Sequence, residues 1–476
     1  MTGGCEHQWT LDSALEATRG VLVGPRDPRR FSGICTDSRR LRAGELFLAL
    51  KGDRFDGHDF VTQVIAAGAA GVVAARDRWE AMGGGSPLPV PVIVVEDTLT
   101  ALGDLAASWR RLHPVPLVAI TGSNGKTTTK EMVAAIMARH CPILKNEGNL
   151  NNLVGLPLTL LELTKAHEAA VVEMGMNHPG EIARLTQIAA PDVGLITNIH
   201  PAHLEGLGSI EGIQAAKGEL FTRLSSRATI VVNQDDPRVV QLATSFPGRR
   251  VGFSTMDPAA QVTLARLLGM DHESTRFLLR LGDETREIRI HVAGRHHLAN
   301  AVAAAAVAWA LKIALLDIAE GLASFRPFDK RMEILALAGR VHLINDTYNA
   351  NPGSMTAALQ TLRALKAGGR ALAVLGDMLE LGERSSELHR EVGRVAAREG
   401  VDYLLAMGKQ AHHILGGAAE GGMPSDRLIQ GNDHGELAYK VRALLTPGAW
   451  VLVKGSRGMR MEKVVEALLQ ALKDSG

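Results

Sequence analysis

The stretch Ile120-Thr121-Gly122-Ser123-Asn124-Gly125-Lys126-Thr127-Thr128-Thr129 decides the fold of this chain. It joins an apolar segment with the pattern of a strand, residues 116–120, to a helical pattern that begins near Lys126. Glycines in such a turn let backbone N–H groups face an anion, and the helix N-terminus adds partial positive charge. Lys126 can reach the β- and γ-phosphates, and the Thr127 hydroxyl can bind Mg²⁺. The sequence therefore predicts an ATP site whose loop consists of Gly122, Ser123, Asn124, Gly125, Lys126, Thr127 and Thr128.

This loop is a shortened variant of the common phosphate-binding pattern. The pattern places a glycine five residues before the Gly125-Lys126 pair, and that position holds Ile120, with Gly122 closer to the pair. The alternative interpretation is a strand-to-helix turn with a structural role only. Such a turn leaves Lys126 and the three threonines after it unexplained, so we favour nucleotide binding.

Length and charge set further bounds on the function. A chain of 476 residues is too long for one ordinary domain, and about three domains are expected. Lys plus Arg is 52 and Asp plus Glu is 51, which argues against a protein that binds nucleic acid or a membrane surface through bulk charge. The most apolar stretch, residues 301–316, is rich in alanine and is interrupted by Lys312. We expect a buried helix there rather than a membrane span.

The cysteines and the N-terminus favour one cellular compartment. Cys5, Cys35 and Cys141 are widely spaced and form no Cys-x-x-Cys pair, which indicates a reducing compartment without a disulfide or zinc framework. Residues 1–19 lack the basic start and apolar core of a secretory signal. We therefore expect a soluble, cytoplasmic protein, and we expect it to be a monomer.

Apolar runs alternate with helical patterns along most of the chain, which is typical of parallel sheets covered on both faces. After the phosphate loop, strand patterns occupy residues 170–174, 194–198 and 228–233. This series predicts a doubly wound α/β core. Residues 277–281 and 288–290 flank Gly282-Asp283-Glu284-Thr285, a hairpin pattern that predicts an antiparallel edge on the same sheet.

The predicted fold class is α/β with three domains. We place a small N-terminal α/β domain at residues 1–113, the central doubly wound domain at 114–327 and a C-terminal Rossmann-like domain at 328–476. The last domain begins a new strand series, at residues 341–344, 371–375, 403–406 and 451–453. Prolines near residues 113–116 and 325–329 mark the two junctions, and Gly83-Gly84-Gly85-Ser86-Pro87 is the expected flexible loop.

Polar side chains beyond two predicted strand ends extend the expected site. Glu173 ends an apolar strand, where ligands bind in open α/β sheets, and we favour a Mg²⁺ ligand over the alternatives of a salt bridge or a helix cap. His200 and His203 follow the next strand, and a pair of histidines beside an acid favours a functional role over a structural one. Lys217 lies in the helical pattern 209–224, and from composition alone it would be a surface charge.

Five segments together resemble the Mur ligase family across the whole chain. They are TGSNGKTTTKE, which contains the phosphate loop, EGNLNNLVGLPLTL from Glu147, PAHLEGLGS from Pro201, GRHHLANAVAA from Gly294, and NDTYNANP from Asn345. The runs Asn149-Leu150-Asn151-Asn152, NDTYNANP and VKGSRGMR from Val453 point to the branch that adds D-alanyl-D-alanine. The segment TDSR from Thr36 resembles the family's uridine-nucleotide domain.

The resemblance implies an activity and its small-molecule partners. Members of this branch are implied to be ATP-dependent ligases that join D-alanyl-D-alanine to UDP-N-acetylmuramoyl-tripeptide through an acyl phosphate, for peptidoglycan synthesis. Neither nucleic acid nor membrane insertion is implied. The family's Mg²⁺ positions correspond to Thr127, Glu173 and His203, and its N-carboxylated (carbamylated) lysine corresponds to Lys217. Lys126, Glu173, His203 and Lys217 are thereby implied to be catalytic.

Further roles follow from the same resemblance. Asn300 corresponds to the adenine-contacting asparagine, Arg331 to an arginine that reaches ATP from the last domain, and Asp346 to the acid near the ribose. The implied substrate-binding residues are Ser38, Arg39, Asn149, Asn151, Asn152, Tyr348, Asn349 and Asn351. His297 stands where relatives often have asparagine, and His200 replaces a more usual small residue.

Three alternatives stay open at this point. A diamino-acid-adding Mur ligase and a folylpolyglutamate synthetase would both share Lys126, Glu173 and Lys217. The uridine-like N-terminal segment disfavours the folate enzyme, and the Asp-Asn-Pro-Arg motif of the diamino-acid-adding ligases is absent from the last domain. A regulatory ATPase with a phosphate loop would need no acceptor pocket.

Overall fold

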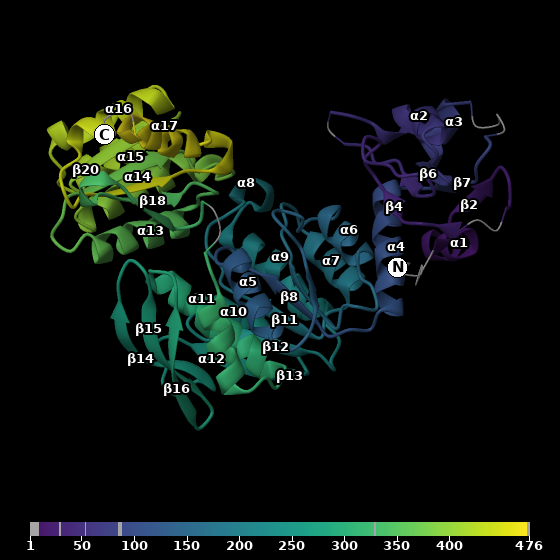
Figure 1. Cartoon of the computed structure of the whole chain (residues 1–476), viewed down its shortest axis with the longest axis horizontal. Coiled ribbons are helices and arrows are strands. Elements are labelled where there is room, and N and C mark those ends of the chain that lie inside the picture. The colour runs from purple at the N-terminus through teal and green to yellow at the C-terminus, as the bar shows by residue number, and fades with distance from the viewer. Residues whose placement is uncertain (1–8, 28–29, 53, 84–87, 328–329, 474–476) are drawn as a thin grey trace.

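The computed structural model describes residues 9–27, 30–52, 54–83, 88–327 and 330–473. They form three α/β units in chain order, each with a main sheet of its own, and the central unit lies between the two others (Figure 1). The predicted fold class is confirmed. The exact domain boundaries stay predictions, and Cys5, most of the glycine-rich loop at 83–87, Phe328 and Asp329 lie outside the described residues. None of the described helices is both long and apolar enough to cross a membrane.

The N-terminal unit is built on a sheet with the order β2-β7-β6-β5-β4, in which β2 pairs antiparallel with β7 and the other pairs are parallel. Its strands are β2 Val21–Val23, β4 Ile34–Cys35, β5 Leu46–Leu48, β6 Gly71–Ala75 and β7 Val92–Val95. The helices α1 Leu11–Thr18, α2 Val61–Ala66 and α3 Arg76–Ala81 accompany it, together with a small pair, β1 Trp9–Thr10 and β3 Arg30–Phe31.

The central unit holds a nine-stranded sheet with the order β16-β15-β14-β13-β12-β11-β8-β10-β9. Strand β8, which precedes the phosphate loop, pairs in parallel with β10 and β11. Strands β8, β10 and β11 are buried on both faces, as the continuous apolar runs predict. The strands are β8 Leu117–Thr121, β9 Ile143–Lys145, β10 Ala169–Glu173, β11 Val193–Ile196, β12 Thr229–Asn233, β13 Arg249–Ser254, β14 Val262–Met270, β15 Thr275–Leu281 and β16 Glu284–Ile290.

Helices cover both faces of this sheet, and α5 begins at Lys126 as predicted. They are α4 Thr98–Leu112, α5 Lys126–Met137, α6 Gly155–Leu161, α7 Glu181–Ala189, α8 Leu204–Leu207, α9 Ile210–Arg223, α10 Pro237–Ala243, α11 Arg295–Ala310 and α12 Leu315–Ser324. The prediction of one buried helix at 301–316 needs a correction. Helix α11 ends at Ala310, and Lys312 has a left-handed backbone with a φ of 65°, so the apolar stretch spans a turn between two helices.

The predicted antiparallel edge is confirmed, because β15 and β16 form a hairpin on the central sheet. Its turn is shorter than the pattern suggested, since β16 already begins at Glu284. The long strand β14 was not predicted. Its residues at 265–270 are only partly buried or exposed, so they give no clear apolar periodicity.

The C-terminal unit has a six-stranded sheet with the order β17-β18-β22-β19-β20-β21, in which β17 runs antiparallel to β18 and the other pairs are parallel. Its strands are β17 Glu333–Ala336, β18 His342–Asp346, β19 Ala371–Gly376, β20 Tyr403–Met407, β21 Leu428–Gln430 and β22 Trp450–Lys454. Its helices are α13 Pro352–Leu365, α14 Ser385–Arg398, α15 Ala411–Glu420, α16 His434–Leu444 and α17 Glu462–Lys473. The last residues of β18 and β22, Asp346 and Lys454, line the same cavity as Lys126 of the phosphate loop.

A buried arginine holds the junction between the N-terminal and central units. Arg110, near the end of α4, donates to the backbone carbonyls of Ala189 at 3.0 Å, His113 at 2.5 Å and Val115 at 2.8 Å. The residue is 6% exposed, and burial lowers the pKa of its guanidinium. Arg110 thereby supplies donors to two carbonyls on the segment that leads into β8 and to one at the end of α7.

We expect Arg110→Ala to lower the free energy of unfolding by about 3 kcal/mol, because three carbonyls lose their donor where water cannot replace it. The matched control is Arg111→Ala, which removes an exposed neighbour and should shift stability by less than about 0.5 kcal/mol. Urea unfolding followed by circular dichroism measures both variants. Equal midpoints for the two variants would contradict the structural role of Arg110.

Candidate active site

The phosphate loop is fixed to the neighbouring strand by side-chain and backbone hydrogen bonds. Asn124 N–H donates to Oδ1 of Asn198 at 2.9 Å, and the Thr197 hydroxyl donates to the Asn124 carbonyl at 2.6 Å. Gly122 has a φ of 145° and packs directly on Thr197, while Gly125 has a φ of 79° and packs on the amide of Asn300. A side chain at either glycine would collide with these partners, so the loop requires glycine at both positions.

Lys126 lies at the start of α5 with its ammonium group over the loop. Its Nζ donates to the Gly122 carbonyl at 2.8 Å. Burial lowers the pKa of Lys126, the nearby Glu173 carboxylate opposes this effect, and the positive charge of Arg331 adds to it. The structure thus brings the lysine of the loop, the acid of β10 and the arginine of the C-terminal unit close together.

Glu173 is 4% exposed, and both of its carboxylate oxygens accept hydrogen bonds. Thr127 Oγ1 donates to Oε2 at 2.6 Å, and Asn151 Nδ2 donates to Oε1 at 2.8 Å. The backbone of Glu173 is held by Asn146, whose side chain bonds its N–H and its carbonyl at 2.8 and 2.9 Å. Lys130, itself 1% exposed, donates to the Asn146 carbonyl. Glu173 is therefore placed by a hydrogen-bonded network that reaches into α5.

Lys217 is not a surface charge. It lies in α9 and is 1% exposed. Burial lowers the pKa of Lys217 well below its usual range, the charge of Lys126 lowers it further, and Glu173 acts in the opposite direction. A lysine in such surroundings is stabilised in its neutral form, which is nucleophilic.

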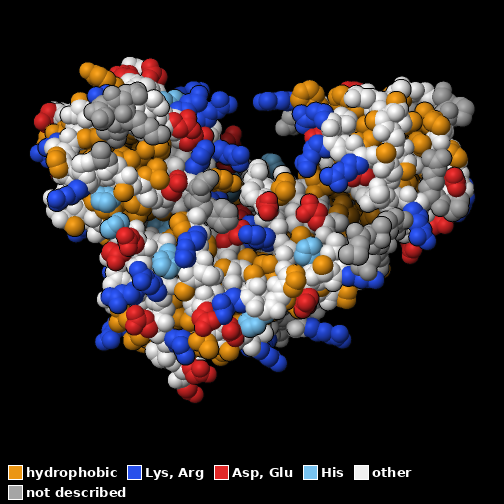
Figure 2. Space-filling view, viewed as in Figure 1, with side chains coloured by type: hydrophobic (Ala, Val, Ile, Leu, Met, Phe, Trp, Pro, Cys, Tyr) orange, Lys and Arg blue, Asp and Glu red, His pale blue; other side chains and the backbone are white. Residues whose placement is uncertain are grey.

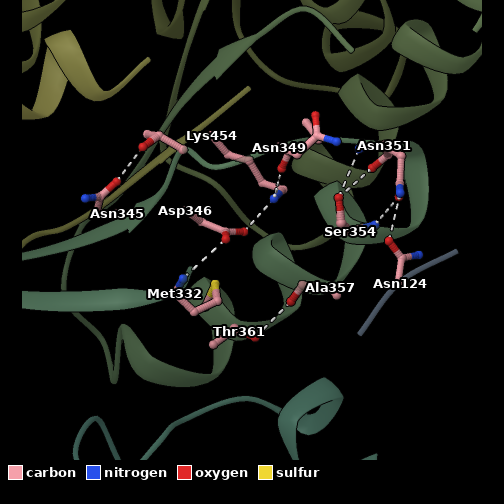
Figure 3. A network of polar contacts seen from close by, with 12 residues as sticks. Asn124, Met332, Asn345, Asp346, Asn349, Asn351, Ser354, Ala357, Thr361 and Lys454 are labelled. Atoms are coloured by element: carbon pink, nitrogen blue, oxygen red, sulfur yellow. Dashed lines mark hydrogen bonds and ion pairs between the residues drawn. The ribbon is translucent and has the colours of Figure 1, made fainter. Parts of the chain in front are cut away.

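The C-terminal unit contributes a second polar network, shown in Figure 3. Asp346, at the end of β18, accepts from Lys454 Nζ at 2.6 Å and from the Met332 N–H at 3.2 Å. Lys454 also donates to the Asn349 carbonyl at 2.8 Å. The buried charge of Asp346 is thus balanced by a lysine from β22, and the pair holds the loop that carries Tyr348 and Asn349.

Arg331 and Tyr348 form the face that the C-terminal unit turns to the phosphate loop. The guanidinium of Arg331 lies 3.8 Å from the centre of the Tyr348 ring, and that of Arg457 lies 5.6 Å from it. Across the interface, Asn351 Nδ2 donates to Oδ1 of Asn124 at 2.8 Å (Figure 3). Asn351 also caps α13 by accepting from the Ser354 N–H at 2.9 Å. Its amide therefore joins α13 to the phosphate loop.

These groups line one cavity of about 720 Å³ between the central and C-terminal units. Most of the predicted site residues border it, namely Ser123, Asn124, Gly125, Lys126, Thr127, Thr128, Asn149, Asn151, Asn152, Glu173, His203, Asn300, Arg331, Asp346, Tyr348, Asn349 and Asn351. Lys217 is not among the residues that line the cavity, but it lies near enough to Lys126 and Glu173 for their charges to affect its pKa. Ser38 and Arg39 do not border the cavity, because they lie in the N-terminal unit, where Arg39 pairs with Asp37 at 2.8 Å.

Histidines border the cavity on two sides. The rings of His296 and His297, at the start of α11, lie 4.1 Å apart, and both ring nitrogens of His297 lack a hydrogen-bond partner among the described residues. Burial lowers the pKa of His296 to about 4 and that of His297 well below its usual range. Burial also lowers the pKa of His200, whose backbone bonds the Ser123 hydroxyl.

Sequence reasoning missed several residues of this site. Glu380 and Asn146 carry no recognisable spacing relative to the phosphate loop, and only the fold brings them to it. Lys454, Ser456 and Arg457 belong to the motif VKGSRGMR, but the sequence analysis gave them no role. Among the described residues, no three His, Cys, Asp or Glu side chains converge in the way of a ready-made metal centre. A bound metal would therefore need further oxygen ligands, such as phosphates.

Comparisons with known proteins agree with this geometry. The family models described as Mur ligase family, catalytic domain, Mur ligase middle domain, and Mur ligase, glutamate ligase domain match residues 30–110, 120–308 and 330–457. The UDP-N-acetylmuramoyl-tripeptide--D-alanyl-D-alanine ligase of Escherichia coli (strain K12) is 38% identical over 461 residues, which cover 96% of this chain and 98% of the relative.

Solved structures show the same likeness. Crystal structure I of MurF from Acinetobacter baumannii has a TM-score of 0.88 at 34% identity and covers 98% of this chain and 100% of that one. The MurF ligase of Thermotoga maritima in complex with ADP has a TM-score of 0.82 at 28% identity and covers 93% and 98%. The family matches and the full-length relatives lead to one conclusion: this chain belongs to the Mur ligase family.

Proposed function

We propose that this chain is an ATP-dependent ligase that joins D-alanyl-D-alanine to UDP-N-acetylmuramoyl-tripeptide and forms the pentapeptide precursor of peptidoglycan. The observation that carries the proposal is the single cavity in which the phosphate loop of one unit faces the Tyr348-Asn349 loop of another. One loop is suited to ATP and the other to a small acceptor, so phosphoryl transfer and amide formation can occur in the same cavity. The names and full-length identity of the relatives support the same reaction.

In the first step, the terminal carboxylate of the tripeptide attacks the γ-phosphorus of ATP, ADP leaves, and an acyl phosphate forms. Lys126 and Arg331 supply positive charge for the phosphoryl oxygens from the two sides of the cavity. In the second step, the neutral amine of D-alanyl-D-alanine attacks the acyl carbon to give a tetrahedral intermediate, from which phosphate leaves while the nitrogen releases one proton. Tyr348 and Asn349 offer hydrogen-bond groups suited to a small zwitterionic dipeptide.

The donor set fits Mg²⁺ bound together with nucleotide phosphates. Thr127 and Glu173 present hard oxygen atoms 2.6 Å apart beside the loop, and oxygen is the ligand atom that Mg²⁺ prefers. Thr127 and Glu173 would hold a first ion, and His203 would contribute to a second. Such ions neutralise charge on the phosphoryl oxygens.

In this proposal the side chain of Lys217 is converted from an amine to an anion. Its neutral amine attacks CO₂, one proton is released, and a carbamate forms on Nζ. A protonated lysine beside Lys126 would repel Mg²⁺, whereas a carbamate supplies two anionic oxygens. The lowered pKa of Lys217 supports the proposal, because only the neutral amine reacts with CO₂.

The donor substrate carries a uridine diphosphate, so it needs contacts outside the cavity. Figure 2 shows a hollow between the N-terminal and C-terminal units with Lys and Arg side chains on both sides of it. We assign Ser38 and Arg39 of the N-terminal unit to the uridine nucleotide, and Asn149, Asn151 and Asn152 to the peptide that extends toward the phosphate loop. A cytoplasmic location and a monomeric state belong to the same proposal.

The preferred acceptor substrate should distinguish the proposed reaction from those of the alternative enzymes. With ATP and UDP-N-acetylmuramoyl-tripeptide present, D-alanyl-D-alanine should be ligated far better than L-alanyl-L-alanine or any diamino acid, because the Tyr348-Asn349 loop is suited to a small dipeptide. ADP release and product mass measure the reaction, and a sample without tripeptide is the control. Preference for a free diamino acid would contradict the proposal, and ADP release without an acceptor would favour a regulatory ATPase.

Lys126→Ala should abolish ligation at unchanged fold. The variant lacks the point charge that meets the transferred phosphoryl group, and we expect a loss of roughly a thousandfold or more in rate. Lys165→Ala, which removes an exposed lysine of the same unit, is the matched control and should keep the wild-type rate. Near-normal turnover in a folded Lys126→Ala enzyme would disprove the nucleotide assignment.

Lys217→Ala should lower the rate by on the order of 100-fold or more, because two anionic oxygens disappear from the charge-stabilising site. Formate or acetate should restore activity in proportion to its concentration, and it should not restore Lys126→Ala. Wild-type enzyme in ¹³C-bicarbonate should show a carbamate carbon by NMR, and Lys217→Ala should lack it. An active Lys217→Ala enzyme, or wild-type enzyme without that carbon signal, would rule out the carbamate.

A further inference from the structure

Two loops from different units meet at the rim of the cavity. One follows β11 and carries His203, and the other follows β19 and carries Glu380. His203 Nδ1 lies 2.6 Å from Oε2 of Glu380, and the Glu205 N–H donates to the Glu380 carbonyl at 3.2 Å. Figure 1 shows the short helix α8, which begins directly after His203, beside the C-terminal unit. A carboxylate of the C-terminal unit therefore contacts a histidine of the central unit.

The Glu380 loop is fixed within its own unit. The Leu379 N–H donates to the Ser456 hydroxyl at 2.9 Å, and the Met378 N–H donates to Nε2 of His389 at 2.8 Å. Asp377 accepts from the backbone N–H groups of Lys409 and Gln410 at 2.7 and 3.1 Å. Glu380 itself has a strained left-handed backbone with a φ of 64°, and the hydrogen bonds around it hold this conformation. The carboxylate is thus presented at a defined place.

The His203 loop is fixed at the phosphate loop, but the imidazole ring is not. The backbone of His200 exchanges hydrogen bonds with the Ser123 hydroxyl at 2.8 and 2.9 Å. His203 also has a left-handed backbone, with a φ of 55°. Among the hydrogen bonds of the described part of the chain, its ring takes part only in the one with Glu380. Glu380 therefore determines how this ring is oriented.

The hydrogen bond between His203 and the Glu380 carboxylate determines which ring nitrogen of His203 carries a proton. An ionised carboxylate can only accept a hydrogen bond, so Nδ1 of His203 carries the proton. In the neutral ring Nε2 then keeps its lone pair, and His203 borders the cavity. Histidines that bind a metal commonly have this arrangement, in which the other ring nitrogen donates to a carboxylate.

We propose that Glu380 is a positioning residue of the ligase, which sets the tautomer and orientation of His203 for metal binding. Because Glu380 belongs to the C-terminal unit, His203 is correctly oriented only while the two units are in contact. Contact between the C-terminal and central units would therefore also orient His203 and so complete the metal site. The inference rests on the proposed function, in which His203 contributes to the second metal ion.

The experiment uses Mn²⁺ as the probe, in the presence of saturating AMP-PNP and UDP-N-acetylmuramoyl-tripeptide. Electron paramagnetic resonance measures the affinity for the second Mn²⁺ ion. Glu380→Ala should weaken it by about 10- to 100-fold. Glu380→Gln keeps an oxygen that can accept from Nδ1 and should restore most of the loss. The matched control is Glu383→Ala, which removes an exposed carboxylate from the same loop and should leave the affinity unchanged.

The ring nitrogens give a second, metal-free measurement. In the ¹⁵N-histidine-labelled enzyme with the same ligands, His203 should show a protonated Nδ1, with its signals assigned by their loss in His203→Ala. Glu380→Ala should convert His203 to a mixture of tautomers. A change in stability alone would not produce this shift.

Three results would overturn the inference. If His203→Ala weakens the second Mn²⁺ ion and Glu380→Ala does not, then the positioning role fails and the proposed function stands. Unchanged His203 ¹⁵N signals in Glu380→Ala would also refute the positioning role. If His203→Ala binds the second ion normally, then the metal role of His203 in the proposed function is wrong as well.

Discussion

The accumulation of positive charge around Glu173 is the constraint on which the rest of this site depends. Lys126 and Lys217 are held beside one carboxylate, and Arg331 approaches from the other unit. Buried charges of like sign are costly unless they are neutralised or compensated. Burial is the main cause of the lowered pKa of both lysines, and a neighbouring positive charge adds to it, from Arg331 at Lys126 and from Lys126 at Lys217. Bound phosphate groups would compensate the positive charge of Lys126, and the proposed carbamate would leave no positive charge on Lys217. The same electrostatic argument therefore favours both the binding of nucleotide phosphates and the proposed carbamate.

The second constraint is that the site is divided between two sheets. Ligands bind at the carboxyl ends of strands in open α/β sheets, and here the ends of β8 and β10 face those of β18 and β22. Among the described residues, side-chain hydrogen bonds join the two units at two places, Asn351 with Asn124 and His203 with Glu380. Each pair links a loop of the C-terminal unit to a loop that is tied to the phosphate site. A structure of this kind can couple domain contact to assembly of the active site.

Much of the fold was predictable, because continuous apolar runs identify strands that are buried on both faces. Strands β8, β10, β12 and β19 were placed within one or two residues for this reason. The Mur ligase resemblance was confirmed. The sequence did not reveal β14, whose outer half is poorly buried, or the break after α11, where apolar residues continue through a turn. For Lys217 the residues alone indicated a surface charge, and the structure shows a buried one.

The sequence by itself determined the local chemistry, since the phosphate loop, its strand and its helix are contiguous and their geometry follows from glycine, lysine and threonine at fixed spacings. Only the tertiary structure decided which distant groups complete the site. Lys454 reaches Asp346 across 108 positions and Glu380 reaches His203 across 177, and no local pattern encodes such contacts. They arise because packing of the sheets and helices brings together loops that are far apart in the chain, so burial and charge compensation at these positions are properties of the folded protein.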